Sequence, residues 1–267
     1  MSGATRFTKL AADAVRDALR NRIGLLAILF ALAIGVFADR CTGIEGGSFV
    51  VNGRLYDVSD GARLVGPLLY GLCALTLVWV AGLVACDSLA RPLSEGTASL
   101  VLSRPVGRRA YALARLAGAL AISVGAGASV LLAVAFLLQA RFGLDLAPAL
   151  VALGVFAVDA WVVAAVAMTL SLWLPRLVAL AAVTIGLQLV VAANLFYTVA
   201  ESSGGMLSAI ERFGPPLATS LVLALSPWFS DGAVAGDWLE PALRLGVWGI
   251  GATALLVAIF GREEIAA

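Results

Sequence analysis

Residues 95–109 read EGTASLVLSRPVGRR and lie between two apolar blocks, at about 64–86 and 112–138. Five arginines, from Arg91 to Arg115, gather around this segment in a chain of which only 13% of the residues are charged. Lysine and arginine concentrate in the cytoplasmic loops of membrane proteins. We therefore expect the segment to face the cytoplasm and to join two membrane spans.

The composition is that of a membrane protein. Of the 267 residues, 61% are hydrophobic and the mean hydropathy is +1.00, whereas soluble domains contain roughly half apolar residues. A span needs about 20 apolar residues to cross a bilayer core of roughly 30 Å. Six blocks meet or approach that length, at about 22–39, 64–86, 112–138, 148–174, 177–199 and 242–260. A seventh run, Leu217–Phe229, is too short and contains Pro227, which favours an interfacial or re-entrant helix.

The distribution of positive charge predicts the sidedness. With a cytoplasmic N-terminus, six spans place twelve Lys and Arg residues inside and six outside, and the opposite topology reverses these numbers. We predict an all-α polytopic fold of one transmembrane domain, residues 1–267, with both termini in the cytoplasm. The outer loops at 40–63 and 200–241 are too small for separate domains, and the Gly-Gly and Asn-Gly pairs of the first favour a hairpin or an irregular cap.

The segment before the first span has the pattern of an amphipathic helix. Its apolar residues fall on one helical face, and the opposite face is rich in Arg and Lys. A helix of this kind lies in the membrane interface, so we expect an interfacial helix over residues 4–22. A helix packed on a soluble partner is the alternative.

The chain lacks the residues that several classes of enzyme and binding protein use. The chain contains no histidine, the commonest metal ligand and general base. It contains no G-x-x-x-x-G-K-[ST] loop for ATP, and its only lysine is Lys9. The net charge of +1 argues against a nucleic-acid partner. We predict a non-catalytic chain that binds no metal, cofactor or nucleic acid.

The segment after Asp87, where we expect the second span to end, combines charge with an apolar surface. Ser94 is a candidate N-cap for a short helix, and Pro105 with Gly107 predicts a turn after it. The arginines beyond that turn suit carboxylates or lipid phosphates. We interpret the segment as a short helix parallel to the membrane with an apolar surface for a protein partner. An ordinary inner loop, rich in arginine because of its topology, is the alternative.

This segment resembles the loop between spans two and three of type-2 ABC transporter permeases. It is similar in particular to the branch that includes the permease of the nitrous-oxide-reductase maturation system. The layout of an amphipathic N-terminal helix, six spans and a broken apolar segment before the last span is similar too. Ala98 and Ser99 are less bulky than is usual in the family. The matching residues of the loop are Glu95, Gly96, Thr97, Leu100, Leu102, Ser103, Arg104, Pro105, Val106 and Arg109.

The resemblance implies a coupling helix that docks into a groove of a separate ABC ATPase subunit. ATP and Mg would be bound by that partner, and two permease copies, as a homodimer or a related heterodimer, would pair with two ATPase copies. The work done would be export of a substrate or conformational work on an extracytoplasmic partner. Ten acids against six arginines on the outer side suit a periplasmic partner, although solvated loops explain them equally well. The implied coupling residues are Asp87, Glu95, Gly96, Thr97, Leu100, Leu102, Ser103, Arg104, Pro105 and Arg109.

Other residues within the spans have two interpretations each. Asp159 is either a substrate or ion contact near the subunit interface, or a satisfied or protonated acid inside the bundle, with Gln188 and Asn194 as candidate partners. Small residues in the third span indicate tight packing within the subunit or a dimer contact, at Ala114, Gly118, Ala121, Gly125 and Ser129. Tryptophans are expected at the outer interface and the upper sixth span, at Trp228, Trp238 and Trp248.

Two other classes of function fit less well. An ion-coupled secondary carrier acting without an ATPase usually contains internal repeats and helices broken at mid-membrane, whereas the second to fifth blocks are continuous. An intramembrane enzyme would need more than the lone acid Asp159 in a chain without histidine.

Overall fold

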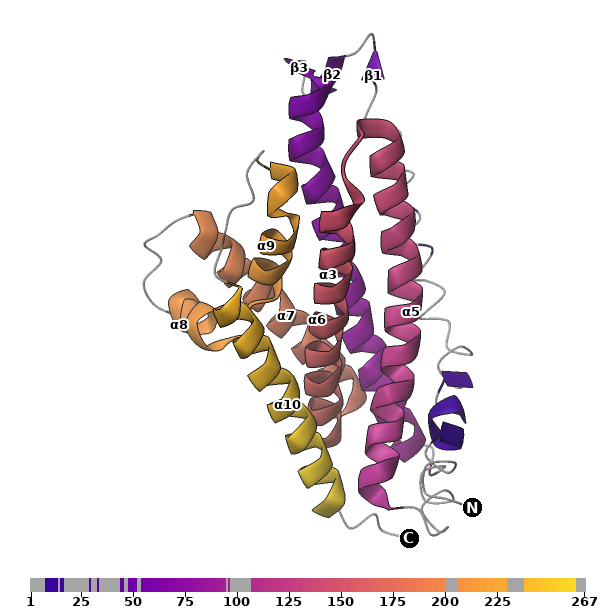
Figure 1. Cartoon of the computed structure of the whole chain (residues 1–267). Coiled ribbons are helices and arrows are strands. Elements are labelled where there is room, and N and C mark those ends of the chain that lie inside the picture. Colours follow the sequence, from indigo (N-terminus) through magenta and orange to yellow (C-terminus); the bar gives the residue numbers. More distant parts are fainter. Residues whose placement is uncertain are drawn as a thin grey trace.

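The computed structural model describes residues 8–13, 15–16, 29, 33, 44–45, 48–51, 54–94, 96, 107–199, 206–229 and 238–262. These residues form a helical bundle with a small sheet at one end (Figure 1). Five helices are long and apolar enough to cross a membrane, and they correspond to the last five predicted spans. The helices are α3 (Val58–Ser94), α5 (Arg108–Phe142), α6 (Leu146–Trp173), α7 (Arg176–Val199), α8 (Met206–Phe213), α9 (Leu217–Phe229) and α10 (Leu239–Arg262).

Most of the interfacial helix at 4–22 lies outside the described residues, and so does the predicted first span, 22–39, apart from Leu29 and Ala33. Within them, residues 8–13 are helical, and Leu10 packs against a buried cluster that includes Tyr111 and Phe260. These residues therefore lie at the end of the bundle where α5 begins and α3 and α10 end (Figure 1). We call this end the base and the opposite end the top.

Helix α6 is the central helix of the bundle. It contacts α3, α5, α7, α9 and α10. A helix that is apolar on all sides can be buried all round, and the alanines of α6 let its neighbours approach closely: Ala152, Ala160, Ala164, Ala165 and Ala167 are all buried. On the α5 side, the ring of Phe156 fills the space over Gly127. The middle of α6 is therefore largely shielded by its neighbours.

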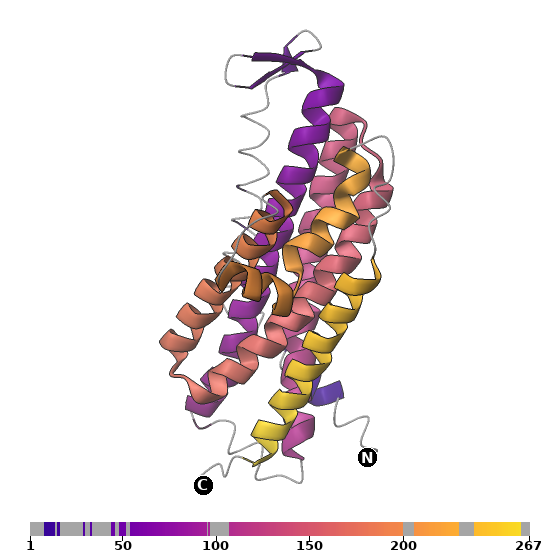
Figure 2. The ribbon, with the colours of Figure 1, turned by 90° about the vertical axis from the view of Figure 1, so that its left-hand side faces the viewer.

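A three-stranded antiparallel sheet lies at the tip of α3 (Figure 2). It consists of β1 (Ile44–Glu45), β2 (Ser48–Val51) and β3 (Arg54–Asp57), in that order. Val51 pairs with Arg54, so the β2–β3 hairpin spans the dipeptide Asn-Gly, which favours two-residue hairpin turns. The expected hairpin in 40–63 is confirmed, and this short sheet is the exception in an otherwise helical fold of the described residues.

Helix α3 extends past both limits of its predicted span, 64–86. At the base the apolar face continues, because Leu89 is fully buried and Leu93 packs against the same cluster one turn later. Ser94 is the last residue of α3, so the interpretation of Ser94 as an N-cap is wrong. Gly96 follows with a φ of 70° and donates its N–H to the Leu93 carbonyl at 3.3 Å, as glycines that end helices do.

The apolar run Leu217–Phe229 forms a short helix, α9, as predicted. The amphipathic helix α8 precedes it, and the two are joined by a Gly-Pro-Pro turn at 214–216. Prolines cannot continue the hydrogen bonding of α8, so the chain reverses there. Helix α9 then runs toward the top beside α3 and α6 (Figures 1 and 2). We call α8, the turn and α9 the hairpin.

Candidate functional site

The described residues among those that the resemblance implies for ATPase coupling lie at the base of the bundle. The structure describes three of them, Asp87, Gly96 and Arg109. Asp87 is only 2% exposed within α3, and Gly96 ends that helix. Their roles in coupling stay predictions. The other seven lie outside the described residues: Glu95, Thr97, Leu100, Leu102, Ser103, Arg104 and Pro105.

The helix that leaves this segment, α5, is joined firmly to α10. The ring of Tyr111 stacks on Phe260, with ring centroids 5.9 Å apart. The Arg115 side chain donates from Nε to the Tyr111 hydroxyl at 3.1 Å and covers its ring. Two residues before Tyr111, Arg109 lies against Gly261 of α10. The start of α5 is therefore packed directly against the end of α10.

Asp159 lies at the midpoint of α6 and has no exposed surface. Neither of its carboxylate oxygens has a hydrogen-bond partner among the described residues. The Ser220 hydroxyl of α9 is close enough to interact with it, but donates its own proton to the Leu217 carbonyl at 2.9 Å. The structure thus places Asp159 inside the protomer, under the first turn of α9. Its role stays a prediction.

The side-chain amides of Asn194 and Gln188, the candidate partners of Asp159, make no hydrogen bond with its carboxylate. Asn194 is buried, and its side-chain oxygen accepts the backbone N–H of Ala218 at 3.2 Å. It therefore satisfies one of the free N–H groups at the start of α9. Gln188 is exposed on the outer face of α7, so it is not a partner of Asp159.

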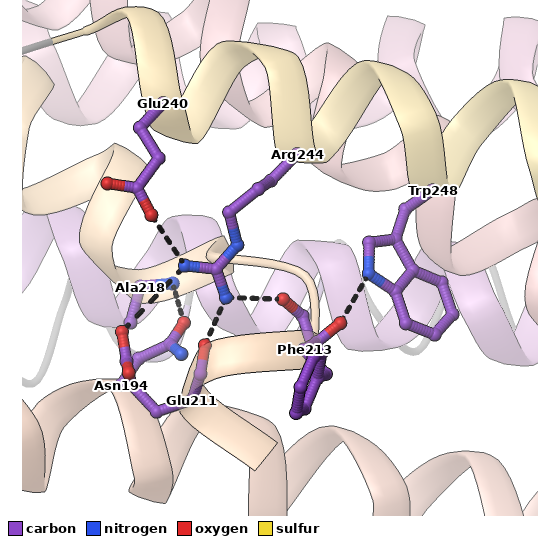
Figure 3. A network of polar contacts seen from close by, with 8 residues as sticks. Asn194, Glu211, Phe213, Ala218, Glu240, Arg244 and Trp248 are labelled. Carbon is purple, nitrogen blue, oxygen red and sulfur yellow. Dashed lines mark hydrogen bonds and ion pairs between the residues drawn. The ribbon is translucent and has the colours of Figure 1, made fainter. Parts of the chain in front are cut away.

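A polar network holds the turn of the hairpin against α10 (Figure 3). The Arg244 guanidinium donates to the backbone carbonyls of Glu211 and Gly214, the second at 2.8 Å. It also pairs with the carboxylates of Glu211 at 3.8 Å and Glu240 at 3.4 Å. One turn on, the Trp248 indole donates to the Phe213 carbonyl at 2.9 Å.

The network satisfies the carbonyls that a helix end leaves free. Helix α8 ends at Phe213, so its last carbonyls have no partner within the helix. A positive charge at a helix C-terminus is also favoured by the helix dipole. Arg244 is one of the six Lys and Arg residues counted on the outer side above, although it falls inside the predicted span 242–260. An arginine within a span requires polar partners, and that signal could have identified it.

Tryptophan side chains connect further helices of the bundle. Trp228 was expected at the membrane interface but is only 4% exposed; its indole donates to the Asp145 carbonyl at 2.9 Å, and its ring meets Tyr70 edge-on. Trp238 and Trp248 are partly exposed, 39% and 37%. Trp161 donates to Thr253 of α10 at 3.1 Å. The top of α9 is thus held by buried contacts, independently of Arg244.

The comparison with protein families identifies the family of this chain. The family model described as ABC-2 family transporter protein matches residues 9–263. The chain belongs to the ABC-2 transporter family. The comparison with curated proteins gives no match.

This ABC-2 permease is a multi-pass membrane protein that acts in transport. Subunits of this kind are the membrane component of an ABC transporter and are generally not catalytic, and the family implies an ATPase partner. Among the described residues, no three His, Cys, Asp or Glu side chains lie together as metal ligands would. The polar groups of the permease that the structure does bring together instead join its helices.

The substitution Asp159→Asn distinguishes the two interpretations of the buried acid. Asparagine has nearly the same shape and no charge, so we expect the melting temperature of the purified permease to change by less than about 3 °C. Unchanged transport in vesicles would then assign Asp159 to packing inside the bundle. A loss of transport without a loss of stability would assign it to a substrate or ion.

Proposed function

We propose that this permease couples ATP hydrolysis by a separate nucleotide-binding subunit to movement of its own helices. The observation that carries the proposal is the family match over 9–263 combined with the segment 95–109, EGTASLVLSRPVGRR, between α3 and α5. In this proposal the segment is the coupling helix, and it faces the cytoplasm together with both termini. The membrane is the bacterial inner membrane.

The packing at the base supports this proposal. Helix α3 leads into the segment, and its buried face contacts α6 at the centre of the bundle. Helix α5 leads out of it and is fastened to α10 by Tyr111 and Phe260. Force applied to 95–106 would therefore reach the centre through α3 and the last span through α5. Interiors as closely packed as these transmit displacements with little loss.

The partners follow from the same proposal. ATP and Mg are bound by the ATPase subunit, while a second permease, identical or related, completes the membrane part. The similarity of the loop to the nitrous-oxide-reductase maturation branch supports conformational work on a periplasmic partner, and export of a substrate is the other possibility within the family.

One observation favours a different function, an ion-coupled carrier without an ATPase. Such carriers bind ions near helices that are interrupted within the membrane. Asp159 is a buried acid beside the first turn of α9, just after the break between α8 and α9. The substitution Asp159→Asn described above tests this function.

Co-purification of the ATPase tests the coupling role. We expect the tagged permease, extracted from membranes in mild detergent, to retain a stoichiometric P-loop ATPase. Replacing Glu95 with Ala, or Leu100 and Leu102 together with Ala, should weaken that complex about 30-fold or more, because truncating a central interface residue costs about 2 kcal/mol. The matched control is Gln139→Ala, an exposed change near the top of α5.

Two results would contradict the coupling role. One is retention of the ATPase and of full ATP turnover by the variants at Glu95, Leu100 and Leu102. The other is a wild-type permease that co-purifies with no ATPase, which would move the ion-coupled carrier to first place.

A further inference from the structure

Asp159 occupies an unfavourable place for a charged group. It lies at the midpoint of α6, about 20 Å from either end of that helix at the usual rise per residue. Its side chain has no exposed surface, and neither oxygen has a hydrogen-bond partner among the described residues. An ionised carboxylate that is buried without a partner is strongly disfavoured relative to the neutral acid. The described surroundings therefore suit Asp159 with a proton bound.

No described positive charge compensates Asp159 from the helices packed against α6, which are α3, α5, α7, α9 and α10. Arg244 of α10 pairs with the carboxylates of Glu211 and Glu240 instead. Tyr70 and Cys73 of α3 lie in the buried cluster that includes the upper half of α6, and groups of these types are neutral near pH 7. Helix α9 contains no charged residue. The other charges on these helices lie within about two turns of the helix ends, at Asp60, Arg63, Asp87, Arg91, Arg108, Arg109, Arg115, Arg141, Arg176 and Arg262.

The start of α9 offers what an ionised Asp159 would need. The Ser220 hydroxyl is close enough to the Asp159 carboxyl group to interact with it. In the described conformation this hydroxyl donates to the Leu217 carbonyl of its own helix, at 2.9 Å. The first turn of a helix also carries a partial positive charge that favours an anion. A donor and a favourable dipole therefore lie beside the carboxyl group, and the donor is engaged elsewhere.

We propose that Asp159 is a proton-binding site that controls how the start of α9 is held. With the proton bound, the acid is neutral and the Ser220 hydroxyl stays on the Leu217 carbonyl, as described. When the proton leaves to water, the carboxylate is an anion, and the Ser220 hydroxyl turns to donate to it. The turn needs only a change of side-chain rotamer, and hydrogen bonds to a charged acceptor are the stronger ones. Loss of the proton thus ties the start of α9 to α6.

A proton suits this position better than a metal ion or an alkali cation. Such ions require several oxygen ligands at once, and the described residues supply only the Ser220 hydroxyl beside the carboxyl group. No three His, Cys, Asp or Glu side chains lie together in the described part of the chain. The positive end of α9 also opposes a bound cation, whereas it does not oppose a neutral acid.

The consequence concerns how many spans hold the hairpin near the start of α9. Asn194 of α7 accepts the Ala218 N–H there, and Arg244 of α10 donates to the Gly214 carbonyl just before it. Neither contact involves Asp159, so both are present in the two protonation states. Asp159 adds a hydrogen bond from α6 only when it is ionised. Binding of a proton therefore loosens the hairpin, and release of the proton fastens it.

Infrared spectroscopy of the purified chain, in a detergent without ester groups, tests the proton site. At about pH 6 ordinary Asp and Glu side chains are ionised, so a carboxylic acid C=O absorption reports a group that keeps its proton. We expect this absorption in the unsubstituted chain and its loss in Asp159→Asn, which has nearly the same shape. We also expect it to disappear from the unsubstituted chain as the pH is raised toward about 10. Identical spectra of the two chains at about pH 6, or an absorption that persists at about pH 10, would overturn the proposal.

Substitution of Ser220 tests the connection to α9. Ser220→Ala removes the donor of the ionised form, so we expect the midpoint of the infrared titration to rise by about one pH unit. Ser226→Ala is the matched control, because Ser226 lies on the same helix and its hydroxyl makes the same kind of bond, to the Leu223 carbonyl at 2.8 Å. We expect no shift for that variant. Equal midpoints for Ser220→Ala and Ser226→Ala would overturn the role of Ser220 and with it the control of α9.

This inference does not depend on the proposed function. The ATPase should still co-purify with Asp159→Asn and Ser220→Ala, since both positions are remote in sequence from the segment 95–109. Failure to bind an ATPase would count against the proposed function only. Failure to find the proton on Asp159 would count against this inference only.

Discussion

Replacing Arg244 with glutamine should lower the melting temperature of the purified chain by about 5–10 °C. The guanidinium is 21% exposed and joins α10 to the end of α8 through two backbone carbonyls and the Glu211 carboxylate. Hydrogen bonds of a charged group contribute about 1.5–3 kcal/mol each. Glutamine keeps one short donor group, so we expect a net loss of about 2–3 kcal/mol.

The effect should be confined to the hairpin. Without Arg244, the carbonyls of Glu211 and Gly214 lose their donor, while the Trp248–Phe213 hydrogen bond still joins the turn to α10. Lysine at 244 should recover part of the stability, because it restores the charge but not the planar set of donors. Protease sensitivity in the region of α8 gives a local measurement beside the melting temperature.

Arg212 provides a matched control for Arg244. It lies in the last turn of α8 and is exposed, and its guanidinium covers only the ring of Phe213. Arg212→Gln removes the same charge at nearly the same place, and we expect a change in melting temperature below about 2 °C. Equal changes for the two substitutions would mean that net charge, and not the network in Figure 3, stabilises the hairpin.

Valine in place of Gly127 should destabilise the centre of the bundle. A Cβ at this position would lie 2.3 Å from Cζ of Phe156, well inside van der Waals contact. The ring is fully buried in α6 and cannot move into open space. Overpacking of a core typically costs about 1–3 kcal/mol and more where nothing can yield, so we expect a reduced yield of monodisperse protein and a lower melting temperature.

Gly125 in the same helix is the control for this substitution. A Cβ there meets nothing within 4 Å, so Gly125→Val changes helix propensity by the same amount without a clash. We expect its melting temperature to stay within about 2 °C of the unsubstituted protein. A Gly127→Val variant as stable as Gly125→Val would show that α5 and α6 do not pack as closely as described.

Gly125 also shows the limit of what the sequence predicts for the third span. Its small residues follow one pattern, yet the structure divides them: Ala114 and Gly118 are buried, whereas Ala121, Gly125 and Ser129 are exposed. Both interpretations of the stripe, packing within the subunit and contact outside it, were therefore compatible with the residues. Which one holds at each position depends on where the neighbouring helices cross α5.

Local patterns predicted much of the fold because the bilayer restricts the chain so strongly. Apolar length predicted the five described spans and the short helix at Leu217–Phe229, and the Asn-Gly pair predicted a β-hairpin, found as β2–β3. These features depend on residues next to one another in the chain and on backbone groups that must be satisfied locally. The EGTASLVLSRPVGRR segment supported the family assignment for the same reason, since it is a local motif.

The sequence alone thus determined the class of protein, the approximate positions of the five described spans and the segment proposed for coupling. Only the tertiary structure decided that Arg244 holds the hairpin, that Asn194 and not Gln188 faces the start of α9, and that Asp159 lies inside the protomer. Each of these depends on side chains far apart in the chain, whose meeting is set by helix crossing and rotation. A helix of nearly uniform apolar residues such as α6 gives no sequence signal for its rotation, because any of its faces could be buried.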